Sequence, residues 1–186
     1  SDLSSVMNRP TVRQLFEEAE AFAPGAPVLP RIRVTDFFEV GALWMGGCLA
    51  QIRGTPLKPA PSASLTAHGY LKYGLAVCAA ALWVALTLPS DWPYLFPLGV
   101  LVFYLVEVNF IFLFPILLDG RKRPMSASFK MTRNLGYIYA LKNLAAITFS
   151  MLFGGFTGRG FKRSWLVGCL TVLFWYEKAR DRDMTR

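Results

Sequence analysis

The chain has 186 residues, of which 54% are hydrophobic, 15% are aromatic and only 17% are charged, and its net charge is +8. Soluble domains average about 45–50% apolar and about 25% charged residues, so this composition excludes intrinsic disorder over most of the chain and argues against an ordinary soluble enzyme. The mean hydropathy of +0.37 favours a small integral membrane protein instead.

The positive charge is confined to the later part of the chain. Residues 1–70 contain six Lys/Arg and six Asp/Glu, whereas residues 71–186 contain fourteen and six and account for the whole +8. The basic residues form short clusters between apolar runs, which is typical of membrane loops rather than of the exposed basic stripe of a nucleic-acid-binding protein. We therefore expect anionic lipids, and no nucleic acid, as partners of these clusters.

Residues 1–70 are predicted to form a peripheral arm that begins with an amphipathic helix over residues 10–22. Asn8 is the predicted cap, with Pro10 in the first turn. One face of this helix is apolar at intervals of three or four residues. The residues expected to dock on a partner through this face are Val12, Leu15, Phe16 and Phe22. Because the rest of the helix is acidic, a protein partner is favoured over anionic lipid.

Two further segments complete the arm. Residues 36–52 include 13 consecutive uncharged positions, which make about 20 Å of helix where a bilayer core needs about 30 Å. They are predicted to form an interfacial or re-entrant helix, with a short span as the alternative. Residues 53–69 contain three prolines and are predicted to be an extended linker.

Residues 71–186 are predicted to form an all-α, polytopic transmembrane domain with four helices at about 72–90, 94–118, 137–156 and 164–176. The fourth run has only 13 residues, or about 20 Å of helix, so three spans are the alternative. The three cysteines lie far apart in apolar runs, and neither a disulfide framework nor a metal site is expected.

Loop charges predict the orientation of these spans. The loop 119–136 carries five Lys/Arg and the turn 90–93 carries none. With four spans, both termini are therefore expected in the cytoplasm, at a bacterial inner-type membrane. The residues assigned to lipid headgroups or to orientation are Arg121, Lys122, Arg123, Arg159, Lys162 and Arg163. The group at 159–163 would face outside in this topology, so either the rule fails there or one of the last two runs does not cross.

Polar side chains inside the apolar runs are the first candidates for chemistry. They are Glu107, Asn109, Lys142 and Asn143. Glu107 lies near the middle of its span, where an acid costs a few kcal/mol. It is either a site for a proton, a cation or a cofactor, or a group that joins two helices. Lys142 is the nearest counter-charge by composition, although Glu107 and Lys142 lie about 18 Å and about 7–8 Å from the cytoplasmic end of their helices.

A contact with a pigment is the other hypothesis drawn from single residues. His68 is the only histidine, which excludes a bis-histidine haem within the chain. It is either a loop residue or an axial ligand to a haem or chlorophyll-type pigment shared with another subunit. Trp83 and Tyr104 lie in mid-span and would face a neighbouring helix or such a ligand. The glycine-rich run 154–160 matches no phosphate-binding motif and is interpreted as a tight turn, or as a lipid-phosphate site with its neighbouring cations.

The sequence contains no nucleophile elbow, zinc-protease motif or paired carboxylates. No catalytic residue and no intrinsic cofactor are predicted. The leading hypothesis is a non-catalytic accessory subunit of a larger membrane complex, with the other subunits as partners and photosynthetic or respiratory complexes as the expected hosts. The alternative is a small membrane enzyme or transporter that acts on a lipid or an ion through Glu107.

Overall fold

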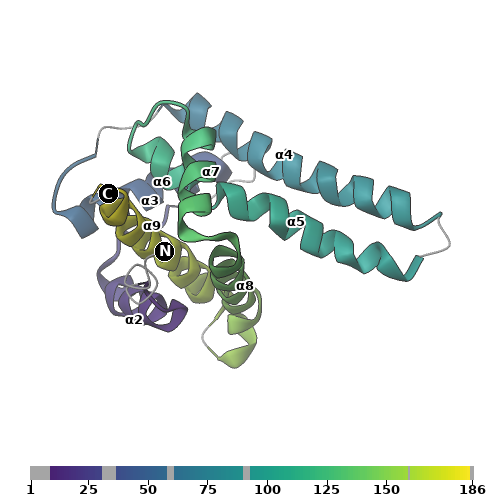
Figure 1. Cartoon of the computed structure of the whole chain (residues 1–186). Coiled ribbons are helices and arrows are strands. Elements are labelled where there is room, and N and C mark those ends of the chain that lie inside the picture. Colours follow the sequence, from purple (N-terminus) through teal and green to yellow (C-terminus); the bar gives the residue numbers. More distant parts are fainter. Residues whose placement is uncertain (1–8, 31–36, 58–60, 90–92, 159, 185–186) are drawn as a thin grey trace. The chain divides into compact units, whose positions relative to one another are not determined.

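Figure 1 shows the computed structural model of the chain, which describes residues 9–30, 37–57, 61–89, 93–158 and 160–184. Within these ranges every regular element is helical, and the prediction of an all-α fold is confirmed. The chain divides into two compact units. The central unit is Val28–Leu144, and the terminal unit combines Ser1–Pro27 with Ala145–Arg186. The division predicted at residue 70 coincides with neither boundary.

The central unit is built around a helical hairpin. Its elements are α3 (Phe37–Arg53), α4 (Ser62–Thr87), a 3₁₀ segment (Pro93–Leu98), α5 (Gly99–Glu107), a 3₁₀ turn (Val108–Phe110), α6 (Leu113–Leu118), α7 (Pro124–Leu135) and the first part of α8 (Tyr137–Phe153). Helices α4 and α5 pack side by side along their length and project from the rest of this unit (Figure 1). The Trp83 indole donates a hydrogen bond to the Leu95 carbonyl at 3.0 Å and ties the two arms of the hairpin together.

Helix α4 begins inside the segment that was predicted to be an extended linker. The last proline of that segment, Pro61, directly precedes the first turn, where a proline is tolerated because no intrahelical N–H donor is needed there. The residues that follow are small and compatible with a helix, and Leu65 is fully buried. The linker prediction was therefore wrong from Ser62 onward, and α4 has 26 residues, or about 39 Å.

The predicted span 94–118 is not one continuous α-helix. Helix α5 ends at Glu107 and α6 begins at Leu113. Pro115 lacks an N–H group, and its ring displaces the carbonyl four residues earlier, which accounts for the break. Two carbonyls at the break accept hydrogen bonds from α7: Ser128 Oγ donates to Asn109 O at 2.9 Å, and Thr132 Oγ1 donates to Val108 O at 3.1 Å. Helix α7 thus supplies side-chain donors to backbone carbonyls at the break.

The terminal unit contains α2 (Val12–Phe22), the second part of α8, a 3₁₀ turn (Gly154–Thr157) and α9 (Phe161–Met184). Helix α2 begins with a capping box in which Thr11 Oγ1 accepts from the Gln14 N–H at 3.3 Å and Gln14 Oε1 accepts from the Thr11 N–H at 2.9 Å. The predicted cap, Asn8, lies outside the described residues.

The apolar face of α2 packs against α9 of the same chain. Leu15 and Ala19 are fully buried, and the ring of Phe22 meets that of Phe174 edge to face at 5.7 Å. Val12 and Phe16 are half-buried. The face that was predicted to dock on another protein is therefore largely occupied within the chain.

Three helices in the described ranges are long and apolar enough to cross a membrane: Ser64–Thr87, Tyr94–Leu118 and Tyr137–Phe156. The fourth predicted run, 164–176, is part of α9 and is not among them. It is only 13 residues long, and α9 continues into a charged segment that reaches Met184. The number of candidate spans is thus three rather than four. Helix α3, predicted as interfacial or re-entrant over 36–52, is also not among them, and residue 36 lies outside the described residues.

Candidate functional site: a buried ion pair at the base of the hairpin

Glu107 forms an ion pair with Lys72 of α4. Glu107 Oε1 lies 3.2 Å from Lys72 Nζ, and the two side chains are only 13% and 6% exposed. The predicted span of 72–90 put Lys72 at the edge of its helix. Because α4 begins at Ser62, Lys72 instead lies well inside the helix, level with the last residue of α5.

Aromatic rings surround the Lys72 ammonium. Lys72 Nζ lies 4.8 Å from the centre of the Tyr73 ring and 5.9 Å from the centre of the Phe114 ring, and both distances suit cation–π attraction. Phe38 of α3 stacks on both rings, with centroid distances of 5.5 Å to Tyr73 and 6.3 Å to Phe114. We call these four residues and Glu107 the Lys72–Glu107 cluster, and it joins α3, α4, α5 and α6.

Gly69 allows α3 to approach α4 this closely. A Cβ atom at Gly69 would lie 2.6 Å from Cγ of Phe38, well inside van der Waals contact. The Phe38 ring therefore rests directly on the backbone of α4. A glycine at position 69 does not by itself predict this contact, because the Phe38 ring is remote in sequence.

The other polar residues predicted within apolar runs do not join this cluster. Lys142, the counter-charge predicted from composition, is exposed on α8. Asn109 donates from Nδ2 to the Leu105 carbonyl at 2.7 Å, while its buried Oδ1 has no hydrogen-bond partner. Asn143 is 5% exposed and its Nδ2 is likewise without a partner. The counter-charge of Glu107 in the structure is Lys72, not Lys142, which composition suggested but the depths of the two residues in their helices already disfavoured.

The residues proposed for a shared pigment are not brought together. His68 lies on α4 and not in a loop, and its Nδ1 donates to the Ser64 carbonyl at 2.7 Å. Trp83 lies 15 positions further along the same helix, which is about 22 Å away. Tyr104 lines a groove of about 490 Å³ between α4 and α5, together with small residues such as Ala80 and Gly99. This groove is almost entirely apolar and suits an acyl chain or a neighbouring helix more than a polar ligand.

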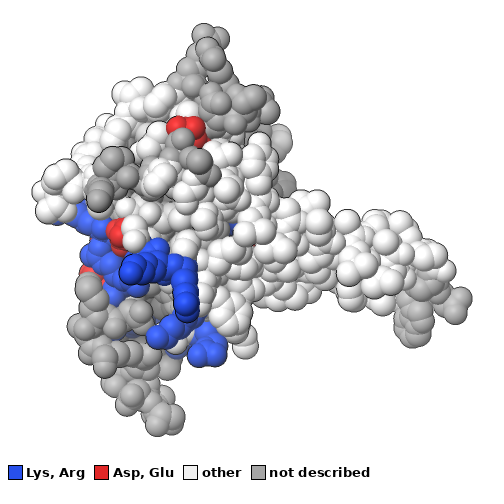
Figure 2. Space-filling view, turned by 90° about the horizontal axis from the view of Figure 1, so that it is seen from above, with Lys and Arg blue, Asp and Glu red and all other residues white. Residues whose placement is uncertain are grey.

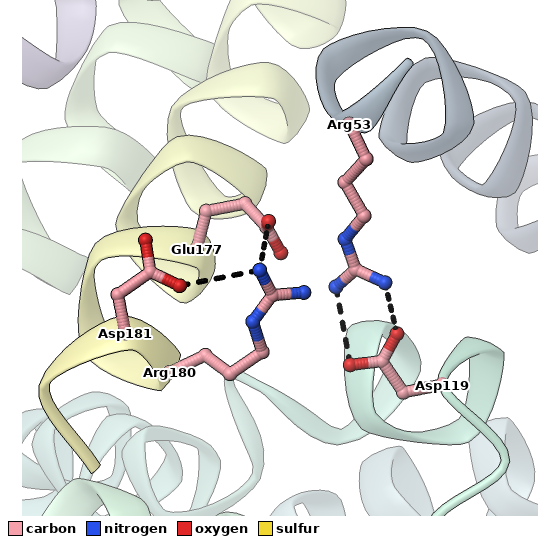
Figure 3. A network of polar contacts seen from close by, with 5 residues as sticks. All are labelled: Arg53, Asp119, Glu177, Arg180 and Asp181. Carbon is pink, nitrogen blue, oxygen red and sulfur yellow. Dashed lines mark hydrogen bonds and ion pairs between the residues drawn. The ribbon is translucent and has the colours of Figure 1, made fainter. Parts of the chain in front are cut away.

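A second buried ion pair in the central unit connects the end of α3 to the end of α6. The Arg53 guanidinium meets the Asp119 carboxylate through two parallel hydrogen bonds, of 2.5 Å and 3.1 Å (Figure 3). Their side chains are mostly buried, and this bidentate geometry is the strong form of the interaction. Neither residue stands out in the sequence, since each simply follows an apolar run.

The basic residues near α7 are largely exposed. Arg121 is half-buried, whereas Lys122 and Arg123 are exposed. Arg123 has the left-handed conformation, with φ of 55°, at the N-cap of α7. In contrast, the described part of the projecting α4–α5 hairpin shows no Lys, Arg, Asp or Glu on the face seen in Figure 2.

The terminal unit has polar features of its own. On α9, Arg180 contacts Glu177 at 2.9 Å and Asp181 at 3.2 Å (Figure 3). A small pocket of about 130 Å³ is lined by side chains of α2, α8 and α9, including Glu20, Arg163 and Ser164. The Ser164 hydroxyl is buried and has no hydrogen-bond partner in the structure, and the pocket has room for a few water molecules.

Two of the terminal cations predicted to contact headgroups, Lys162 and Arg163, are exposed at the start of α9. The third, Arg159, lies outside the described residues. Gly158 and Gly160 on either side have φ of 81° and 78°, conformations that glycine adopts readily. This backbone agrees with the interpretation of the glycine-rich run as a tight turn.

Comparison of the chain with protein-family models, with curated proteins and with solved structures gives no match. A search of the described side chains finds no group of three or more His, Cys, Asp or Glu arranged to hold a metal ion.

Proposed function

We propose that the chain is an integral membrane protein that acts as a non-catalytic accessory subunit of a larger membrane complex. The surface of the α4–α5 hairpin carries this proposal. Between Lys72 and Glu107 the only charged residue is Asp91, and large apolar side chains on both helices are exposed, among them Leu82, Leu86 and Val100. Monomeric soluble proteins rarely expose apolar patches of more than a few hundred Å², so this surface suits lipid or the helices of a partner.

The dimensions of the hairpin support its insertion into a bilayer. The apolar helix Ser64–Thr87 has 24 residues, or about 36 Å, which exceeds the thickness of about 30 Å of a hydrocarbon core. The part of α4 from Lys72 to its last residue, Thr87, at the far end of the hairpin, measures about 24 Å. If the far end of the hairpin lies at one headgroup layer, the ion pair lies close to the opposite surface of the hydrocarbon core, where charged groups are tolerated better than at the centre.

The environment of Glu107 supports a structural role. Its charge is balanced by Lys72, and the pair is nearly closed off by the rings of the Lys72–Glu107 cluster. A transporter or enzyme that uses this acid would need it open to water, to an ion or to substrate. The observed arrangement suits a connection between helices more than a transport or catalytic site.

The packing of α2 on α9 supports the placement of both ends of the chain on one side of the membrane. Glu18 of α2 lies 2.7 Å from Lys178 of α9, and the half-buried Glu20 lines a pocket with Arg163. These charges require water, so the paired helices α2 and α9 lie in water or at the membrane interface and not within lipid. The number of crossings between α2 and α9 is then even, and the hairpin provides two. We assign this common side to the cytoplasm of a bacterial-type membrane on the basis of the basic loop Arg121–Arg123.

Purification from native membranes in mild detergent tests the proposal. We expect the chain to resist extraction by alkaline carbonate and to migrate on native gels in a complex of fixed subunit stoichiometry. The absorption spectrum and the lipid analysis of that complex identify any pigment or lipid that it shares, and the spectrum would reveal a photosynthetic or respiratory complex by its pigments. Glu107→Gln is expected to leave the subunit composition unchanged, with Lys142→Gln as the matched control. A chain that migrates alone, and loses an ion- or lipid-dependent activity through Glu107→Gln, would overturn the accessory role and favour the transporter or enzyme.

A further inference from the structure

Four exposed phenylalanines form a continuous patch in the terminal unit, where α8 ends and α9 begins. They are Phe149, Phe153, Phe156 and Phe161, with 65%, 48%, 77% and 56% of their surface exposed. Successive ring centroids lie 4.6, 6.4 and 5.2 Å apart. We call this patch the aromatic tip. Such a cluster in water is unfavourable, because apolar surface of this extent is normally removed from solvent.

The glycine-rich turn builds the aromatic tip. A Cβ atom at Gly155 would lie 2.4 Å from the Phe161 ring, so this ring lies against bare backbone. The positive φ angles of Gly158 and Gly160 then reverse the chain between Phe156 and Phe161. The two rings meet edge to face as a result.

Exposed cations follow the aromatic tip directly. Lys162 and Arg163 are both exposed in the first turn of α9. Apolar rings beside Lys and Arg are the pattern of segments that lie in the interface of an anionic bilayer, where the rings reach the acyl boundary and the cations meet headgroup phosphates. This charge complementarity selects an anionic lipid surface as the occupant of the patch.

The contact between α2 and α9 limits how many helices between them can cross the membrane, and so determines whether the aromatic tip lies at the membrane surface. If the hairpin crosses twice, as in the proposed function on which this step rests, α8 cannot also cross before α9 meets α2. Helix α8 is long and apolar enough to span, whereas α3 is not among the candidate spans; with α3 outside the count, an even number of crossings leaves α8 at the membrane surface. In the four-span topology the cations at 159–163 would face outside, against the positive-inside rule. If α8 does not cross, they lie on the same side as the basic loop Arg121–Arg123, in agreement with that rule.

We propose that the aromatic tip, with Lys162 and Arg163, is an interfacial anchor that inserts its rings into the headgroup boundary of an anionic bilayer on the side of the Arg121–Arg123 loop. The test uses the full chain reconstituted in sealed vesicles of phosphatidylcholine with phosphatidylglycerol. Cys78 and Cys169 are replaced by Ser, and a bimane label is placed at Phe156→Cys or, as a reporter of hairpin insertion, at Leu86→Cys. Quenching by lipids brominated at shallow or deep acyl positions measures depth.

We expect shallow bromines to quench the label at position 156 and deep bromines to quench the label at position 86. Removal of both cations by Lys162→Gln and Arg163→Gln should shift the insertion equilibrium of the tip toward water by about fivefold for each charge, since each basic residue contributes about 1 kcal/mol at an anionic surface. The matched variant Lys130→Gln with Arg133→Gln, an exposed basic pair on α7, should leave quenching at position 156 unchanged. In vesicles without phosphatidylglycerol the two variants should behave alike.

Sidedness provides the second readout. An impermeant maleimide should label Lys122→Cys and Lys162→Cys from the same side of the vesicle. Labelling from opposite sides would show that α8 crosses and would overturn the anchor. A label at position 156 that stays unquenched while the label at position 86 is quenched would also overturn the anchor and leave the proposed function intact. If neither label is quenched, membrane insertion itself is wrong and both proposals fail.

Discussion

Replacement of Lys72 by methionine tests the Lys72–Glu107 cluster most directly. The change keeps an unbranched side chain that is one heavy atom shorter and removes the ammonium group, so Glu107 is left buried without its counter-ion. Loss of one partner of a buried pair destabilises a protein by about 3–5 kcal/mol. At the observed separation of 3.2 Å, Coulomb's law with an effective dielectric constant of about 20 gives an attraction of about 5 kcal/mol. The two values agree, and we expect the free energy of unfolding to fall by this amount.

The reverse substitution, Glu107→Gln, should cost less. Lys72 then keeps its contacts with the faces of Tyr73 and Phe114, which contribute about 0.5–2 kcal/mol. In the double variant both charges are gone, so the loss of stability should be smaller than the sum of the two single losses. We expect a coupling free energy of about 2–3 kcal/mol between the two sites.

Unfolding of the detergent-solubilised protein by increasing fractions of sodium dodecyl sulfate, followed by tryptophan fluorescence, measures these values. Lys142→Met is the control, because this exposed lysine lies in another apolar helix and should change stability by less than about 0.5 kcal/mol. Additive losses in the double variant, or equal effects of Lys72→Met and Lys142→Met, would refute the reasoning.

Two substitutions and one labelling experiment probe the packing of the central unit. Gly69→Ala should destabilise by about 1–3 kcal/mol, since its new methyl group would overlap a ring of the cluster. Thr132→Val should cost about 1–3 kcal/mol in unfolding free energy, because it leaves the Val108 carbonyl at the helix break without its donor. Burial raises the pKa of the Cys48 thiol to about 12, so at pH 7–9 this thiol stays protonated and should react with maleimide only after denaturation, as mass spectrometry can show.

Each of these changes has a matched control. Gly74→Ala lies on the same helix with open space around its Cβ position, and it should raise stability by up to about 1 kcal/mol. Thr171→Val removes only a hydrogen bond within α9 and should cost less than Thr132→Val. Cys78 is exposed and should react in the folded protein. Because the raised pKa of Cys48 favours the protonated thiol in the folded state, its contribution to stability is full below about pH 9 and is lost as the pH rises toward 12. Equal reactivity of the two thiols would contradict the packing of α3.

The apolar helices could be predicted from the sequence, and their partners could not. Hydropathy is a local property, so the runs 94–118 and 137–156 were located to within a few residues. The start of α4 was missed because three prolines close together suggest an extended chain, although all of them precede its first turn. The break after Glu107 was also missed, since uniform hydrophobicity conceals the effect of Pro115.

Contacts between distant residues explain the remaining differences. The pairing of Glu107 with Lys72 depends on how α4 and α5 are aligned in the hairpin, and composition pointed instead to Lys142. In the same way, the spacing of apolar residues along α2 predicts an apolar face but does not specify what covers it. That Leu15 is buried against α9 of the same chain follows from tertiary structure alone.

The ion pair at the base of the hairpin also constrains how the chain enters a membrane during synthesis. Lys72 is made 35 residues before Glu107, so a nascent α4 that partitions alone carries an uncompensated ammonium group to the edge of the hydrocarbon core. The cost there is smaller than the value of about 2.5–3.5 kcal/mol for a charge at the bilayer centre on insertion scales, but it is still unfavourable. Neutralisation becomes available only once α5 has been completed. The two helices therefore enter the bilayer most favourably together, as one preformed unit.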